Sequence, residues 1–321
     1  MITELVDRIL TGDDDAAFEL EEQVDDDPVL LRRLRPHLLR LIDAEVYIPV
    51  KLFGEADETF QREAVRRVES GEDSEQDLVA ILTATRGPVV EAAFRGWLER
   101  PPSGMDANAL TRFLRRYGWD FDDRGRRREI CGNVAYRLVP EVPAPSPAGT
   151  APAEERCPWC TAALWTALDG DTADPRFAAA LAHTGWRGRL RILTCFVCST
   201  YATVYTQVSP DGGATWSAYT TQPTYLKERK PAPEEPPAVR LVPGEERPGG
   251  YEGHDCEGGS TLGGRPGWIQ DPDFPDCPAC GRLMNYVGAV AGGDTIGQDH
   301  GVLFLFLHEP CGLAAVVSQF D

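Results

Sequence analysis

The sequence predicts an α+β protein of several domains, with an all-α region at the N-terminus and a mostly β region after it. Three observations support this prediction: apolar residues recur at helical spacing, cysteine pairs alternate with β-forming runs, and proline-rich stretches separate these parts. We expect a helical domain over 1–140, a Pro/Ala-rich linker over 141–156, a first zinc-ribbon β module over 157–228, a Pro-rich linker or loop over 229–250 and a second zinc-ribbon β module over 251–321.

The N-terminal helices are predicted from apolar stripes and from residues that begin or end helices. Asp27 precedes Pro28, a favoured pairing of helix cap and first helical residue, and leucines then recur three and four residues apart. Gly87 and Pro88 mark the end of one helix and the start of the next. Short helix pairs of this kind are typical of a HEAT-like solenoid, but no clean repeat period is present. An irregular helical arrangement is therefore the alternative.

The C-terminal half is predicted to be mostly β because β-branched and aromatic runs lie between the cysteine pairs. These runs are Arg189–Thr194, Tyr201–Val208 and Val302–Leu307. Ser209–Trp216 matches the S-x-D-x-G-x-T-W pattern of a tight hairpin, in which an aspartate bonds the turn and a tryptophan packs beneath it. Both parts of this half have the order cysteine pair, strands, second ligand pair, strand. That order indicates a diverged duplication.

Two sets of four metal ligands fall in this β region. They are Cys157, Cys160, Cys195 and Cys198 in the first set and Cys277, Cys280, His308 and Cys311 in the second. Zinc binds such nitrogen and sulfur ligands at tetrahedral corners, two from each of two tight turns. We predict two structural Zn²⁺ ions per chain. We predict no catalytic residue, because a catalytic zinc keeps an open position, whereas both sets already supply four ligands.

Other interpretations of the cysteines stay open. In the first set Thr161 and Ser199 stand where a zinc knuckle usually has glycine. Cys157-Pro-Trp-Cys160 also resembles a thioredoxin-type dithiol, which needs a thiol of lowered pKa at a helix N-terminus. Outside the two sets, Cys131 is expected to be a buried apolar residue. Cys256 lies beside His254 in a glycine-rich loop, and whether the two join a further metal site is left undecided.

Charge and hydropathy narrow the class of partner. The 321-residue chain has a net charge of −19, which argues against nucleic-acid binding because such proteins present a basic surface. The most apolar run, Val302–Leu307, is far shorter than the ~20 residues that span a bilayer, and the N-terminus lacks the pattern of a signal peptide. We therefore expect a cytoplasmic protein with no nucleic-acid or membrane partner. Its acidity favours a basic protein partner.

Part of the sequence resembles a known family. The segments that carry the resemblance are Leu262–Asp271, Pro275–Gly281 and His300–Phe306, followed by His308-Glu309-Pro310-Cys311. They resemble the YwqG-like bacterial family, of unknown function, and the C-terminal domain of eukaryotic programmed-cell-death-protein-2-like proteins. The resemblance is strongest over 260–321 and weaker over 157–228. In the usual pattern the last knuckle is C-x-x-C, and here His308 replaces its first cysteine.

The resemblance and the residues together favour one function over two others. The bacterial family implies no established enzyme activity, and the eukaryotic relatives imply a chaperone role for a basic ribosomal protein. We expect a zinc-stabilised, non-enzymatic protein-binding module, chaperone-like or an adaptor for a basic protein. The first alternative is an immunity or antitoxin-type protein that inhibits a toxin enzyme. The second, less favoured, is a thiol oxidoreductase that uses Cys157 and Cys160.

Overall fold

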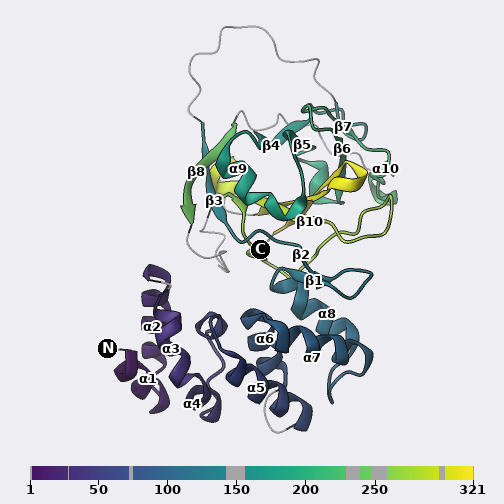
Figure 1. Ribbon diagram of the computed structural model, residues 1–321. Coiled ribbons are helices and arrows are strands. Elements are labelled where there is room, and N and C mark those ends of the chain that lie inside the picture. Colours follow the sequence, from purple (N-terminus) through teal and green to yellow (C-terminus); the bar gives the residue numbers. More distant parts are fainter. Residues whose placement is uncertain are drawn as a thin grey trace. The chain divides into compact units, whose positions relative to one another are not determined.

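The chain divides into two compact units, Met1–Arg128 and Glu129–Asp321. The computed structural model (Figure 1) describes residues 2–27, 29–71, 75–141, 156–228, 239–247, 259–295 and 301–320. The first unit is helical, and the second is built around a large antiparallel sheet. The predicted α+β class, with a helical region before a mostly β region, is therefore confirmed.

The first unit is a succession of short helices followed by a small hairpin. Its helices are α1 (Ile2–Leu10), α2 (Asp14–Asp26), α3 (Leu30–Leu34), α4 (Leu38–Asp43), α5 (Glu58–Ser70), α6 (Glu75–Thr85), α7 (Pro88–Glu99) and α8 (Ala107–Arg116). The hairpin joins β1 (Trp119–Phe121) and β2 (Arg127–Glu129). Aspartates cap several helices: Asp13, Asp57 and Asp106 each accept a hydrogen bond from a backbone N–H in the first turn.

Proline interrupts the leucine-rich stretch near residue 36. The leucine spacing predicts one helix from residue 28, whereas α3 begins at Leu30 and ends at Leu34. Pro36 then lies in a 3-10 turn, Arg35–His37, before α4 begins. A proline inside a helix removes one backbone hydrogen bond and clashes with the preceding turn, so the chain resolves the conflict by dividing the helix. Pro28 lies outside the described residues.

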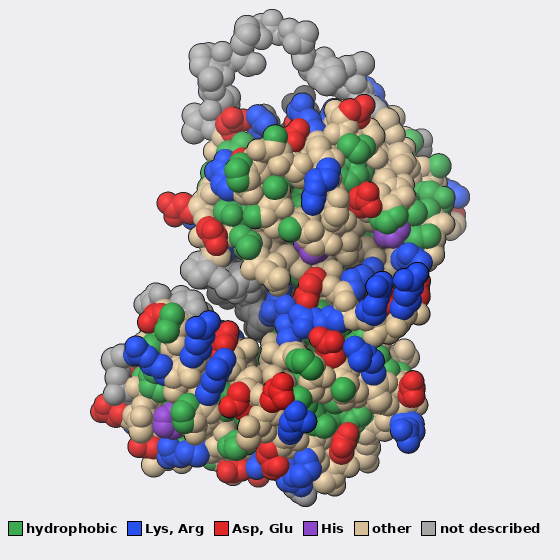
Figure 2. Space-filling model, viewed as in Figure 1, with side chains coloured by type: hydrophobic (Ala, Val, Ile, Leu, Met, Phe, Trp, Pro, Cys, Tyr) green, Lys and Arg blue, Asp and Glu red, His purple; other side chains and the backbone are tan. Residues whose placement is uncertain are grey.

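The core of the helical unit is completed by the hairpin. Trp119 in β1 is fully buried, and its indole N–H donates to the carbonyl of Thr83, 3.1 Å away. Its ring meets the ring of Phe94 edge-on, with centroids 5.7 Å apart. The hairpin therefore packs as part of this unit, whose surface in Figure 2 carries interspersed acidic and basic side chains.

The second unit contains an eight-stranded sheet in the order β7-β6-β12-β11-β10-β9-β3-β8. The strands are β3 (Ala135–Pro140), β6 (Val204–Val208), β7 (Ala214–Trp216), β8 (Leu241–Arg247), β9 (Thr261–Gly263), β10 (Asn285–Ala291), β11 (Val302–His308) and β12 (Leu313–Gln319). The central strand β11 is buried along its whole length. A separate ribbon of β4 (Trp165–Asp171) and β5 (Arg189–Thr194) packs over it, and α9 (Pro175–Ala180) follows β4.

The strand pairing in this sheet does not follow the domain boundaries expected from the sequence. Strand β3, expected in the helical domain over 1–140, pairs with β8 and β9 instead. Strand β6, from the expected first module, pairs with β12 of the expected second module. Strands from the two expected β modules therefore share one sheet, and both modules belong to one compact unit, which begins at Glu129. The physical reason is that strand partners are chosen by burial and register, which act between residues far apart in sequence.

The Pro-rich stretch expected as a linker or loop over 229–250 contains a strand. Leu241–Arg247 forms β8, at one edge of the sheet, with Leu138 opposite Pro243. An edge strand tolerates proline because one of its sides donates no ladder hydrogen bond. Proline content alone therefore did not predict the strand at Leu241–Arg247. Residues 229–238 and 248–250 lie outside the described residues, as do residues 142–155 of the expected Pro/Ala-rich linker.

No helix in the described part of the chain is long and apolar enough to cross a lipid bilayer.

Candidate metal centres

The first ligand set forms one compact cluster at an end of the β4–β5 ribbon. Cys157 and Cys160 precede β4, and Cys195 and Cys198 follow β5. All four side chains are buried, and their sulfur atoms lie within 4.8 Å of one another. The antiparallel register, with Trp165 opposite Thr194, brings the two cysteine pairs together.

The sulfur spacing in this first cluster fits a tetrahedral metal site. The Sγ atoms of Cys157 and Cys198 are 3.7 Å apart, and those of Cys160 and Cys195 are 3.5 Å apart. Bonds of about 2.3 Å to a central zinc-sized ion would give tetrahedral edges of about 3.8 Å. A disulfide would instead require about 2.05 Å. The donor set therefore fits a four-coordinate ion better than a pair of disulfides.

The second ligand set lies at the matching end of β10 and β11. Cys277 and Cys280 precede β10, His308 ends β11, and Cys311 lies in the 3-10 turn Glu309–Cys311. The Sγ atom of Cys280 is 3.7 Å from Nε2 of His308, and the four ligand atoms lie within 4.8 Å of one another. This set could hold a second metal ion, with imidazole in place of one thiolate.

The two centres are built on the same backbone turn. In each, the N–H of the first cysteine donates to the carbonyl five residues later, and the N–H four residues later donates back to that cysteine. The bonds are Cys157 to Ala162 (2.8 Å), Thr161 to Cys157 (2.9 Å), Cys277 to Arg282 (2.7 Å) and Gly281 to Cys277 (2.7 Å). The same turn therefore places the first two ligands of each set.

The strands that follow these turns repeat as well. Both β4 and β10 begin eight residues after the first cysteine. Each pairing shows an irregularity at the same point, between Thr166 and Leu168 in β4 and between Tyr286 and Gly288 in β10. Cys160 is thus the counterpart of Cys280, and β4 is the counterpart of β10. This correspondence supports the diverged duplication that the sequence order indicated.

Thr161 takes the conformation that glycine takes in the second turn. Its φ is 69°, against 71° for Gly281. A threonine with positive φ is strained by about 1–2 kcal/mol, so this turn keeps its shape against a local cost. The missing glycine in the first set therefore does not change the geometry of the turn. Ser199 needs no such conformation, because it lies in a 3-10 turn that continues from Cys198.

Hydrogen bonds to the sulfur atoms of the first cluster shift the pKa values of its cysteines. Backbone N–H groups of Trp159 and Cys198 donate to Cys157 and Cys195 Sγ respectively, each at 3.4 Å. Hydrogen bonding with the side chains of Cys195 and Cys198 lowers the pKa of Cys157. The same bonds raise the pKa of Cys195 and of Cys198. The two backbone N–H donors stabilise the thiolate form that a metal ligand takes.

The two centres differ in the side chains that pack over them. Leu226 packs in the same buried cluster as the first set, and Trp216 packs against that cluster, with its ring edge-on to Trp159 at 5.4 Å. Trp216 ends the predicted hairpin, whose turn is bonded as expected: Asp211 accepts the N–H of Gly213 at 3.0 Å. In the second set, Cys280 is exposed and Cys311 is half-buried.

The remaining cysteines add no ligand to these sets. Cys131 is buried, as expected, and is not part of either cluster. Cys256 and His254, whose part in a further metal site the sequence leaves undecided, lie outside the described residues. Within the described residues, the groups that could hold a metal ion are the two predicted sets.

A groove of about 370 Å³ lies between β4 and β8, a feature that the sequence did not indicate. Residues Leu164–Asp169 line one side and Val239–Leu241 the other. In the described residues β4 pairs with β5 alone and β8 with β3 alone, so one edge of each strand has no strand partner. Figure 1 shows the two strands on the same side of the unit.

The charges beside this groove are matched within the chain. Asp169 accepts two hydrogen bonds of 2.7 Å from Arg189, which lowers the pKa of the Asp169 carboxyl. Arg240 forms an ion pair of 3.0 Å with Glu141. The groove therefore presents apolar side chains and strand edges rather than an excess of charge.

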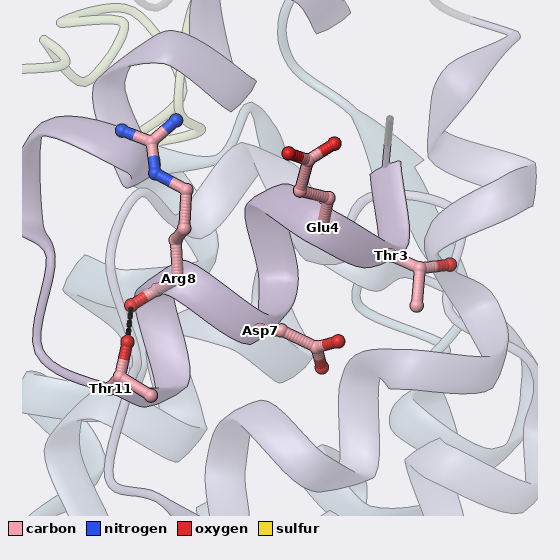
Figure 3. Close-up of a pocket in the computed structure, with 5 residues that line it drawn as sticks. All are labelled: Thr3, Glu4, Asp7, Arg8 and Thr11. Atoms are coloured by element: carbon pink, nitrogen blue, oxygen red, sulfur yellow. Dashed lines mark hydrogen bonds between the residues drawn. The ribbon is translucent and has the colours of Figure 1, made fainter.

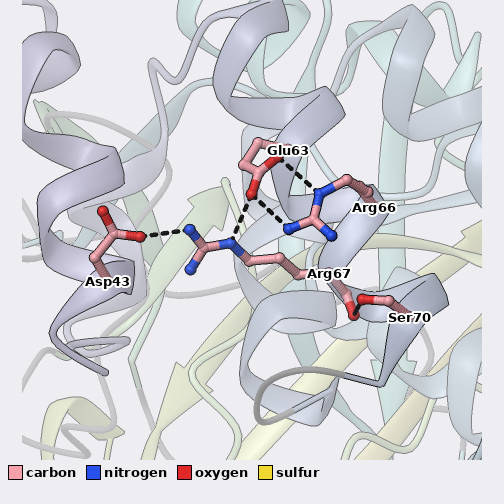
Figure 4. A network of polar contacts seen from close by, with 5 residues as sticks. All are labelled: Asp43, Glu63, Arg66, Arg67 and Ser70. Carbon is pink, nitrogen blue, oxygen red and sulfur yellow. Dashed lines mark hydrogen bonds and ion pairs between the residues drawn. The ribbon is translucent and has the colours of Figure 1, made fainter.

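Two depressions on the helical unit are lined by charged side chains, with arginines that pair with acids of the same unit. The first, about 540 Å³, is lined by Thr3, Glu4, Asp7, Arg8 and Thr11 (Figure 3). Arg8 there forms ion pairs with Asp13 and Glu19. In the second, about 520 Å³, Glu63 receives hydrogen bonds from Arg66 and Arg67, which lower its pKa to about 2 (Figure 4). In both, the arginines are engaged by acids of the same unit.

The chain is similar to a bacterial protein without a described activity. It is 28% identical over 263 residues to the uncharacterized protein YpfL of Salmonella typhimurium strain LT2, a match that covers 79% of this chain and 61% of that protein. The chain thus spans about three fifths of the length of this relative. No protein-family model matches the chain, and no solved structure matches it.

Proposed function

We propose that the protein is a zinc-stabilised, non-enzymatic binding module that takes an extended segment of a basic protein partner. The observation that carries this proposal is the groove between β4 and β8, which is bounded by strand edges without a strand partner in the described residues. An exposed strand edge offers main-chain hydrogen bonds to an incoming strand, and the pockets beside it select side chains. The partner would extend the β region at this groove.

Zinc is the metal that the donor sets favour. Cys₄ and Cys₃His sets bind zinc in closed structural sites, as in zinc ribbons. All eight ligands are supplied by the chain, so neither ion keeps a position for a substrate or a water molecule. Thiolate ligands persist in reducing compartments, and we therefore assign the protein to the cytoplasm. The resemblance to the YwqG-like family, with no established activity, is consistent with a structural role for both ions.

Hydrogen-bonding groups of β8 point into the groove. The carbonyl of Arg240 accepts the N–H of Glu141 at the end of β3, so the polar groups of Arg240 face β3. In an antiparallel pair these groups alternate, and those of Val239 and Leu241 therefore face away from β3 and towards the groove. Proline and charged side chains on an edge strand discourage the addition of a further strand. In β8 such residues lie further along the strand, at Pro243, Glu245 and Glu246. Within the described residues, the groove end of this edge, Val239–Leu241, contains no proline and no acidic residue.

In the second ligand-bearing repeat, which contains β10, a further strand lies along the edge that corresponds to the edge of β4 that is free in the described residues. There, β9 pairs with β10, with Leu262 opposite Gly288. The counterpart of Gly288 in β4 is Leu168, which pairs with Ile192 of β5 on one side and has no strand on its other side in the described residues. A Cβ at Gly288 would lie 2.4 Å from the carbonyl oxygen of Thr261, so Leu168 prevents an equally close approach to β4. We therefore assign the main-chain bonds of the partner segment to β8, with β4 as the apolar wall.

A net charge of −19 supports a basic partner, because long-range attraction would raise its local concentration. The helical unit adds surface to this module. Contacts between α5 and α6 and between α7 and α8 support a HEAT-like pairing of its helices.

Affinity capture with a matched pair of variants tests this function. We expect the wild-type protein to capture basic proteins, with binding that weakens as salt rises above about 0.15 M. Val239→Asp places a charge in the groove and should abolish capture. Val29→Asp, the same substitution on an exposed valine of the helical unit, should leave capture unchanged. Melting temperatures establish that both variants are folded. Captured proteins without basic bias or salt dependence, or equal capture by both variants, would contradict the proposal.

A further inference from the structure

The two equivalent centres differ in the exposure of the cysteine that occupies the same place in each. Cys160 and Cys280 occupy the same position of the same backbone turn. The side chain of Cys160 is only 4% exposed, whereas Cys280 is exposed. Among the cysteines of the described residues, Cys280 is the one classed as exposed, and its neighbour Cys311 is half-buried. The chain therefore contains a shielded centre and an open centre of the same design.

The difference arises from the residue between the two cysteines and from what packs on it. In the first turn Trp159 is 5% exposed and meets the ring of Trp216, while Leu226 packs in the same cluster. In the second turn Ala279 takes the place of Trp159, and it is exposed. A methyl group cannot cover the neighbouring sulfur as an indole ring does. Cys280 thus remains open on the side where Cys160 is closed.

We infer that the second centre is a modification site, at which Cys280 is the thiolate that peroxides and small alkylating electrophiles reach first. The inference rests on the metal occupancy proposed above. Oxidation at Cys280 then releases the ion of the second centre, while the first centre keeps its ion. Thiolate character and exposure decide which cysteine an oxidant reaches, and Cys280 combines both when it ligates a metal.

The oxidation balances with hydrogen peroxide as the oxidant. The Cys280 thiolate attacks one peroxide oxygen, so an S–O bond forms, the O–O bond breaks and hydroxide leaves. Sulfur loses two electrons, and peroxide gains them. The Cys311 thiolate, within 4.8 Å, then attacks the sulfur of Cys280, forms a disulfide and expels a second hydroxide. Both hydroxides take protons from solvent to give water. Cys277 and His308 alone remain as ligands.

Limited oxidation of the intact metal-loaded protein tests the inference. The zinc content is first measured by elemental analysis. Hydrogen peroxide is then added stepwise with a colorimetric zinc chelator present, and modified cysteines are located by peptide mass spectrometry. We expect one ion per chain to be released first, with Cys280 and Cys311 oxidised and Cys160 unchanged. Iodoacetamide in a separate experiment should label Cys280 at least tenfold faster than Cys160.

The outcomes separate the inference from the proposed function. Release of both ions together, or equal labelling of Cys160 and Cys280, overturns the inference while leaving the proposal of two structural ions intact. A chain that binds no zinc refutes the proposed metal occupancy, and with it the inference. Trp216→Ala uncovers the first centre and should bring the labelling of Cys160 towards that of Cys280. If this variant fails to fold, the wild-type comparison of the two cysteines decides alone.

Discussion

Removing one ligand of the first centre should destabilise the second unit far more than removing another buried cysteine. The perturbation is Cys195→Ala, and the control is Cys131→Ala. Both side chains are almost completely buried, but Cys131 belongs to neither ligand set. The two substitutions therefore remove the same sulfur atom from a similar degree of burial. Their difference isolates the contribution of the metal site.

The magnitude follows from the ligand count. Structural zinc contributes about 10–16 kcal/mol of apparent binding free energy, so one ligand of four is worth roughly 3–4 kcal/mol. Loss of a buried sulfur alone costs about 1 kcal/mol. For a unit of this size, 1 kcal/mol shifts the melting temperature by about 2–4 °C. Cys195→Ala should therefore lower the melting temperature by roughly 8–20 °C, against about 2–4 °C for Cys131→Ala.

Thermal unfolding followed by circular dichroism, with zinc content measured on the same samples, checks this prediction. Chelator added to the wild type should lower the melting temperature by at least as much as Cys195→Ala, because it removes whole ions whereas the substitution removes one ligand of four. The reasoning fails if Cys195→Ala melts within 2 °C of Cys131→Ala while still binding two ions per chain, where 2 °C is about the effect of 1 kcal/mol. It also fails if chelator leaves the wild-type melting temperature unchanged. An active dithiol at Cys157 and Cys160 would be indicated by that second result together with disulfide reductase activity.

Two further predictions concern backbone fit and pH. Gly263→Ala should destabilise by more than 3 kcal/mol in chemical denaturation, because φ is 73° and the new Cβ would lie 2.4 Å from the carbonyl oxygen of Val134. Gly125→Ala, with φ of 69° and open space around it, should cost only about 1–2 kcal/mol. Glu63→Gln should cost under about 1 kcal/mol at pH 7, since the ion pairs are partly exposed. The arginines lower the Glu63 pKa to about 2, so its contribution is present above about pH 4.5 and is lost as the pH falls towards 2. Unfolding at pH 7 and pH 3 measures this, and an equal difference between variant and wild type at both values would contradict it.

Several features were predictable from sequence because they depend on neighbouring residues. The ligand sets follow from short spacings of soft ligands, and the structure brings both sets together. The tight hairpin at Ser209–Trp216 follows from its own side chains, since Asp211 bonds the turn that contains it. Aspartate caps such as Asp106 likewise act on a backbone N–H within their own turn. Each of these needs no information from distant parts of the chain.

By itself, the sequence determined the two candidate ligand sets, the helical start of the chain and the β character of its second half. Tertiary structure decided that β6 and β12 pair across the two expected modules, and that a proline-rich stretch supplies β8. It also decided that Cys160 is closed and Cys280 open, although their local patterns match. The physical reason is that ligand type and turn shape are local properties. Strand partners, a groove between two edges and the cover over a sulfur atom depend on residues that meet only in the folded chain.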